Sequence, residues 1–119
     1  MKTESILDRR SQRMAIVRSP TGEGKHQYVY GAVDDDGNIM FGEGFKCTRL
    51  SAGSYEVKFE QPFVKQPGVV CTILGQTWKT VDLSIAIARI DMKKFICFTT
   101  TPELPFDCAF TFMAFGDIE

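Results

Sequence analysis

Residues 44–74, GFKCTRLSAGSYEVKFEQPFVKQPGVVCTIL, carry the clearest structural pattern in the chain. After the polar turn SAGS, the apolar residues Tyr55, Val57 and Phe59 alternate with charged residues. This period of two is typical of a β-strand with one buried face. Two prolines then interrupt the chain before VVCTIL, residues 69–74, a run apolar enough to be covered on both faces. These residues therefore predict two strands of an all-β domain.

The same kind of segment recurs along most of the chain. Strands are predicted at residues 28–33, 39–45, 45–49, 81–90, 95–100 and 106–115. Asp36-Gly37, between the first two of these runs, is a strong hairpin signal because glycine tolerates the positive φ of primed turns. Seven or eight short strands without a long helical stretch indicate a single antiparallel β-sandwich. A chain of 119 residues is long enough for one such domain.

Residues 1–26 differ from the rest. Their apolar residues are scattered among four arginines, and SPTGEG, residues 19–24, has the composition of a loop or linker. We therefore expect an N-terminal arm or linker at residues 1–26 and the sandwich domain at residues 27–119. The arm is either a loose terminus or a segment that packs on a neighbouring subunit.

Composition and charge exclude several classes of partner. A net charge of −1 argues against binding nucleic acid or an anionic membrane surface, which usually requires a basic surplus. No apolar run approaches the ~20 residues that a membrane-spanning helix needs. The charged N-terminus lacks the apolar segment of a signal peptide. We expect a protein made in the cytoplasm that either stays there or reaches a virion or the outside of the cell through assembly or lysis.

The sequence offers no catalytic, metal or cofactor motif. The only histidine, His26, lies in a flexible-looking stretch, which argues against a histidine-based dyad or a zinc site. The acidic run DDDGN lacks the glycine and glutamate spacing of an EF-hand, so a solvated turn is expected there. No CxxC pair is present, and buried free thiols are expected at Cys47, Cys71, Cys97 and Cys108. We expect a protein that is not an enzyme and binds no cofactor and no metal.

The strand predicted at residues 106–115 is apolar on both faces. Cys108, Phe110, Phe112 and Ala114 alternate with residues 109, 111, 113 and 115, which are Ala, Thr, Met and Phe. In a two-sheet sandwich only one face of each sheet lies against the core. Burying the second face favours oligomerisation. The alternative is that the N-terminal arm covers it.

Residues 44–70 contain, in order, GF, an arginine, SAGSYEVKF, PF, a proline and VV. This order resembles a domain common at the tips of bacteriophage tail fibres and in related prophage proteins. From residue 57 on, VKFEQPFVKQPGVVCTIL, IAIARI, FICFTTT and the aromatic last strand are similar to H-type lectins. The resemblance covers roughly residues 30–116. It implies a homotrimer, and it raises the expectation of binding sugars of the N-acetylgalactosamine type at subunit junctions.

The resemblance carries only some site residues over. Arg89 matches an arginine of the lectins, whereas Ile85 stands where they have another. Thr101 also matches, but Pro102 and Glu103 follow it in place of a tryptophan-histidine pair. These differences argue against that sugar specificity and leave a different glycan open.

A sugar site needs an aromatic face and planar polar groups. Trp78, Gln76, Lys79 and Asp82 form the best such group in the sequence, although a tryptophan in a polar loop also serves to pack a sheet edge. The candidate ligand-binding residues are therefore Trp78, Gln76, Lys79, Asp82, Arg89, Thr101 and Glu103.

Taken with the resemblance, these residues predict a non-enzymatic trimeric module for receptor or carbohydrate recognition, in a setting like a phage tail or a lectin. The alternative is a structural or assembly component of a larger particle with no small-molecule ligand.

Overall fold

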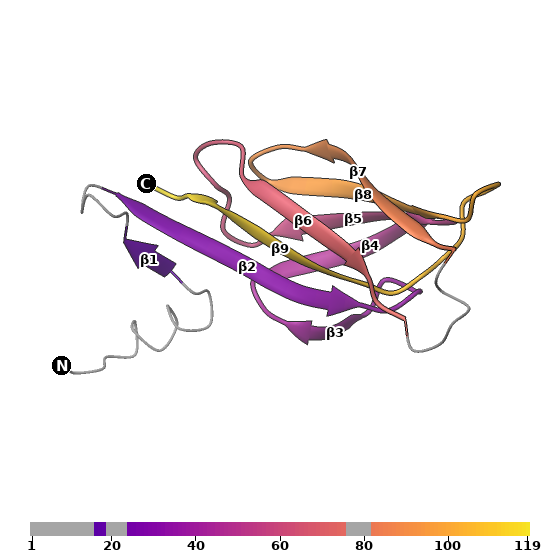
Figure 1. The fold of residues 1–119 in the computed structure, drawn as a ribbon. Coiled ribbons are helices and arrows are strands. Elements are labelled where there is room, and N and C mark those ends of the chain that lie inside the picture. The colour runs from indigo at the N-terminus through magenta and orange to yellow at the C-terminus, as the bar shows by residue number, and fades with distance from the viewer. Residues whose placement is uncertain (1–15, 19–23, 76–81) are drawn as a thin grey trace.

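Two antiparallel sheets packed face to face make up the fold (Figure 1). The computed structural model describes residues 16–18, 24–75 and 82–119. The first sheet contains β1 (Ile16–Arg18), β2 (Lys25–Val33), β3 (Ile39–Gly42), β6 (Gly68–Ile73) and β9 (Phe110–Asp117). The second contains β4 (Phe45–Ser51), β5 (Ser54–Phe59), β7 (Ser84–Ile90) and β8 (Lys94–Thr100). The prediction of an all-β antiparallel sandwich is confirmed.

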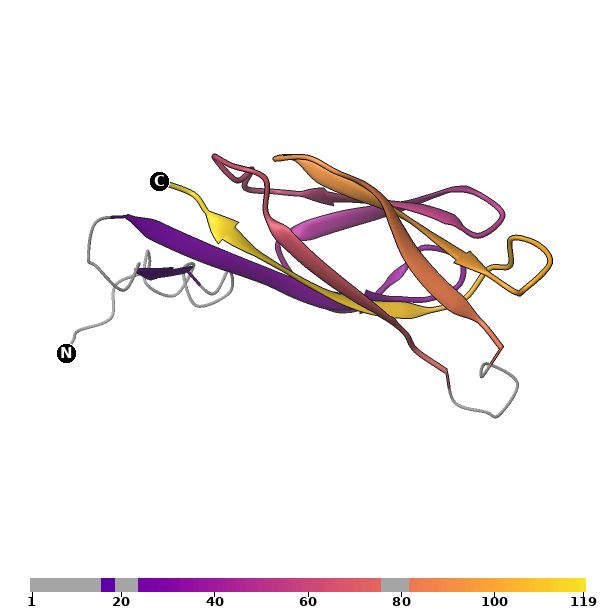
Figure 2. The same ribbon diagram turned by 45° about the horizontal axis from the view of Figure 1, so that its top comes forward.

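The strand order brings distant parts of the sequence together. The first sheet runs β1-β2-β9-β6, with β3 also paired to β2, and the second runs β4-β5-β8-β7. Figure 2 shows β6 and β7, the edge strands of the two sheets, along one side of the sandwich. Among the described residues, none forms a helix long and apolar enough to span a membrane.

The core lies between the sheets and is mainly aromatic. As the alternation predicts, Tyr55, Val57 and Phe59 of β5 are buried. Phe112 of β9 packs edge-on against Phe45 of β4, with ring centroids 4.8 Å apart. Full burial of each such side chain contributes about 1.5–3 kcal/mol, so this layer is a main source of stability.

One end of the sandwich, which we call the loop end, gathers several connections. It is the end at which β2, β4, β6 and β8 finish, on the right of Figure 1. Its described residues are 34–38, 52–53, 74–75, 82–83 and 101–109.

Several predicted strand boundaries are wrong. Residues 106–109 precede β9, because Cys108 N donates to the Tyr55 hydroxyl (3.2 Å), not to a neighbouring strand. The run 39–45 is divided between β3 and β4, because Gly42 and Gly44 adopt φ of 105° and 89°. Residues 82–83 lie in a turn, and β7 begins at Ser84.

The expectation that residues 69–74 are covered on both faces is not met within the chain. Residues 68–73 form β6, which ends the strand order of its sheet. Val70 points away from the core and is 64% exposed. In a two-sheet sandwich only the inner face of a strand is covered, so a run this apolar leaves apolar surface exposed on the outer face.

His26 lies in β2, not in a flexible stretch. Its Nε2 is 2.8 Å from Oδ1 of Asp117, the residue opposite it in β9. β1 pairs with the first three residues of β2, so strand structure includes residues that the sequence assigns to the arm. Residues 1–15 lie outside the described residues, and the packing of the arm on a neighbouring subunit stays a prediction.

Candidate functional site

Two adjoining hollows open at the loop end. The first has a volume of about 450 Å³, and the second of about 360 Å³. Leu83 and Phe106 line both. The first, which we call the loop-end site, is lined by Asp82, Leu83, Thr101, Pro102, Glu103 and Phe106. The second is also lined by Asp34, Asp35, Met40, Asp107, Cys108 and Ala109.

Phe106 has an anchored backbone although the residue is 51% exposed. Its backbone N–H donates to the carbonyl oxygen of Thr99 (3.0 Å), and its carbonyl accepts from the Thr99 hydroxyl (2.6 Å). Thr99 is fully buried, and its own N–H donates to the carbonyl of Gly53 (2.8 Å). An aromatic ring on an anchored backbone loses less conformational freedom on binding than one on a loose loop, because only its side-chain torsions remain to be fixed.

The turn at residues 101–104 also contributes to the loop-end site, through Thr101, Pro102 and Glu103. The Thr101 hydroxyl oxygen accepts from the N–H groups of Glu103 (3.2 Å) and Leu104 (3.1 Å). The N–H of Thr101 donates to the carbonyl of Leu104 (2.8 Å). Short hydroxyl side chains commonly stabilise turns in this way. Thr101 therefore acts mainly by fixing the turn that carries the exposed side chain of Glu103.

Asp107 ties the second hollow to the β4–β5 hairpin. Its carboxylate accepts from Arg49 Nε (2.9 Å) and from the N–H of Gly53 (2.7 Å). The bond from Arg49, followed by the one from Gly53, holds the pKa of Asp107 below its usual range. The Asp107 carboxylate is therefore ionised at neutral pH, and Arg49 and Gly53 already occupy part of its hydrogen-bonding capacity.

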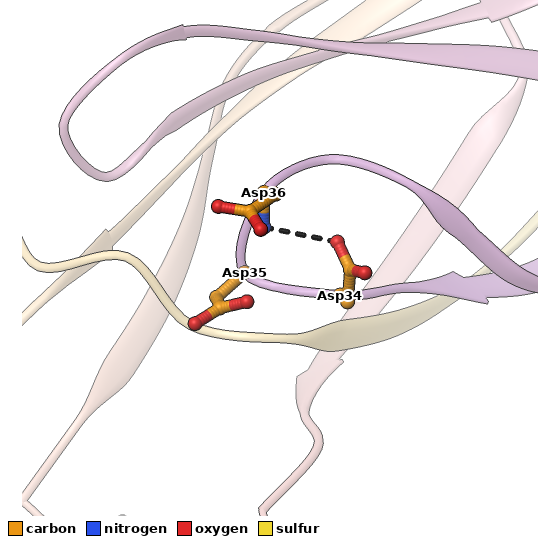
Figure 3. Close-up of side chains that lie close together, drawn as sticks. All are labelled: Asp34, Asp35 and Asp36. Carbon is orange, nitrogen blue, oxygen red and sulfur yellow. Dashed lines mark hydrogen bonds between the residues drawn. The ribbon is translucent and has the colours of Figure 1, made fainter.

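The acidic run at residues 34–36 closes the β2–β3 hairpin (Figure 3). The three carboxylates lie within 4.8 Å of one another. Oδ1 of Asp34 accepts from the N–H of Asp36 (2.9 Å) and of Asn38 (2.8 Å), and these backbone bonds, with Asn38 first, lower the pKa of Asp34. Gly37, at φ 91°, completes the turn. Asp35 and Asp36 are exposed, as expected of a solvated turn.

The chain matches no family model, no curated protein and no solved structure. The resemblance to tail-fibre tips and H-type lectins therefore stays a prediction from short sequence motifs.

The structure brings together three of the predicted ligand-binding residues. Asp82, Thr101 and Glu103 line the same hollow, although 18 residues separate the first from the second in the chain. Arg89 lies at the other end of β7, opposite Ile96 of β8. Gln76, Trp78 and Lys79 lie outside the described residues.

Phe106 is the residue that sequence reasoning missed. The pattern assigned it to a strand, in which its side chain would be a packing residue. The available signal was its position directly after residues 101–105, TPELP, because a run with two prolines is typical of a loop.

The thiols behave as apolar groups. Cys97 and Cys108 are buried, and Cys47 and Cys71 are partly buried. Burial raises the pKa of Cys47 to about 11, and contact with the Cys71 thiol, together with burial, raises that of Cys97 further. These two thiols are therefore protonated at neutral pH, a state that is poorly nucleophilic.

Proposed function

We propose that this protein is a non-enzymatic, homotrimeric binding module that recognises a hydroxyl-rich ligand, a cell-surface glycan, at the loop end. The observation that carries the proposal is the loop-end site itself. An anchored, half-exposed Phe106 ring shares a hollow with the carboxylates of Asp82 and Glu103.

This arrangement fits the two kinds of surface on a sugar. The apolar C–H face of a pyranose packs on an aromatic ring, and Phe106 offers that ring. Sugar hydroxyls donate hydrogen bonds, and ionised carboxylates accept them. A volume of about 450 Å³ lies within the usual range of small-molecule pockets.

The resemblance to tail-fibre tips and H-type lectins supports the trimeric form and a role in receptor recognition. In that setting the protein is made in the cytoplasm and acts on a virion or outside the cell. Trp78 precedes Asp82 by four residues in the chain, so it remains a predicted second aromatic contact.

A glycan array probed with the full chain tests the proposal. We expect specific signals for the wild type, at least a tenfold loss of affinity for Phe106→Ala, and no loss for Phe98→Ala. Phe98 is the matched control, because its ring is 44% exposed but lies on β8 outside the hollow. No binding to any glycan, or equal binding by all three proteins, would contradict the proposal.

The second candidate is an assembly component without a small-molecule ligand. It is favoured by a specific observation, the exposed apolar residues on the outer face of the first sheet. A silent array together with a stable oligomer would favour this alternative.

A further inference from the structure

The outer face of the first sheet is an aromatic and aliphatic surface. Strand register places Tyr28 beside Phe115, Tyr30 beside Met113, and Ala32 between Phe41 and Thr111. Met113 in turn lies beside Val70 of β6. Paired residues in an antiparallel sheet point to the same side, so these rows form one continuous surface. We call it the apolar face and define it as Tyr28, Tyr30, Phe41, Val70, Met113 and Phe115.

These side chains are open to solvent in the single chain. Tyr30 is 53% exposed, Phe41 52%, Met113 48% and Phe115 44%. A groove of about 510 Å³ runs over the centre of the face, between Tyr30 and Val70. Scattered exposed apolar residues are normal, but a contiguous set rimmed by polar groups marks an interaction surface.

The second sheet provides an internal comparison. Its outer face carries exposed Lys46 and Lys58 and an ion pair between Lys94 Nζ and Glu56 Oε2 (3.0 Å). The apolar face has no charged side chain among its six residues. The ionisable pair of His26 and Asp117 (2.8 Å) lies at one margin of the face. The cores of protein–protein interfaces are enriched in tyrosine, phenylalanine and methionine and depleted in lysine and glutamate. The apolar face has this composition.

We propose that copies of this chain pack against one another through the apolar face. The number of subunits, three, is taken from the proposed function on which this inference rests. The inference adds the surface through which the subunits contact one another.

The size of the face suits this partner. The four strands β3, β2, β9 and β6 contain 4, 9, 8 and 6 residues, and at about 4.8 Å spacing and about 3.4 Å rise they give roughly 440 Å² for each copy. Two copies together bury roughly 900 Å², which is above most crystal-packing contacts and at the low end of specific interfaces.

Charge also favours a second copy. When two copies of the same surface come into contact, any charged group on it faces a like charge, which is unfavourable. The six residues of the apolar face carry no charge. The net charge of −1 leaves little repulsion between whole copies. Val70, at one edge of the face, and Phe41, at the other, are both more than half exposed. An exposed edge seated in the groove of the next copy makes a head-to-tail contact, which closes into a ring when the rotation permits.

Sedimentation equilibrium of the full chain tests the inference. We expect the wild type to have a multiple of the 13.4 kDa chain mass, and Val70→Glu to raise the dissociation constant at least about tenfold, because a charge would be buried. Tyr30→Lys should act in the same way. Phe98→Glu, on the outer face of the other sheet, should leave the mass unchanged. Circular dichroism establishes that each variant is folded.

A wild type of 13.4 kDa at all micromolar concentrations would overturn the inference. An oligomer mass that neither Val70→Glu nor Tyr30→Lys changes would also overturn the inference. This includes the case in which only deletion of residues 1–15 dissociates the oligomer. Glycan binding is measured separately, so a silent array with a face-dependent oligomer would contradict the ligand proposal and leave this one standing.

Discussion

Single residues at the loop end join segments that are far apart in the sequence. Tyr55 is fully buried, and its hydroxyl donates to the carbonyl of Asp35 (2.8 Å) while accepting from the N–H of Cys108. At the surface, the Asp107 carboxylate also joins distant segments, because it accepts hydrogen bonds from Arg49 and from the N–H of Gly53. Such residues fix the geometry of both hollows.

Asp107 should make stability depend on pH in the acid range. Its folded pKa lies below 3.8, the ordinary value, so its contribution is fully present above that value and is lost as the pH falls through the folded pKa. We expect Asp107→Asn to lose stability at pH 7 and to show a shallower fall in urea midpoint between pH 5 and pH 2. Arg49→Gln should have a similar effect, and midpoints that run parallel in all three proteins would rule out this role.

Residue pattern alone could not identify these contacts. Tyr55 was correctly predicted to face the core, because alternation determines the face. Its hydrogen-bond partners come from positions 35 and 108, and no local signal links those positions. For the same reason Phe106 was assigned to a strand, and His26 to a flexible segment although Asp117 lies opposite it.

At the scale of elements, the β4–β5 turn supports the loop-end site. Gly53 adopts φ +68°, and a Cβ there would lie 2.4 Å from the carbonyl oxygen of Thr99 and 2.8 Å from the N of Phe106. These are the backbone groups that anchor Phe106.

Gly53→Ala should therefore destabilise the fold by about 1–3 kcal/mol, because it forces both strain and a backbone shift. The same variant should weaken ligand binding by displacing Phe106. The matched control is Gly68→Ala, where the nearest atom would be 3.9 Å away. Thermal unfolding of the two variants measures the difference, and equal losses would show that the turn has no special constraint.

Strands were predictable as elements, whereas their ends were not. The strand predicted at residues 81–90 is present as β7, in which Ile85 packs against the core, and a bulge before Arg89 then shifts the alternation. Bulges, like the glycines that divide β3 from β4, depend on the pairing partner, which is absent from a local sequence window.

At the scale of the whole molecule, the two proposed activities occupy separate surfaces. The apolar face covers the outside of the first sheet, and the loop-end site lies where the strands finish. The sequence could predict a second apolar surface, because residues 106–115 are apolar on both faces. It could not show that β2, β6 and β9 adjoin, since that requires the strand order.

The central claim is that ligand recognition occurs at the loop end. The most direct test is a titration of the ¹⁵N-labelled full chain with the best glycan of the array, followed by amide chemical shifts. We predict that shifts concentrate at residues 82–83 and 101–109, and that Tyr30 and Met113 on the apolar face stay unchanged. Shifts confined to the apolar face, or none at saturating glycan, would contradict the account.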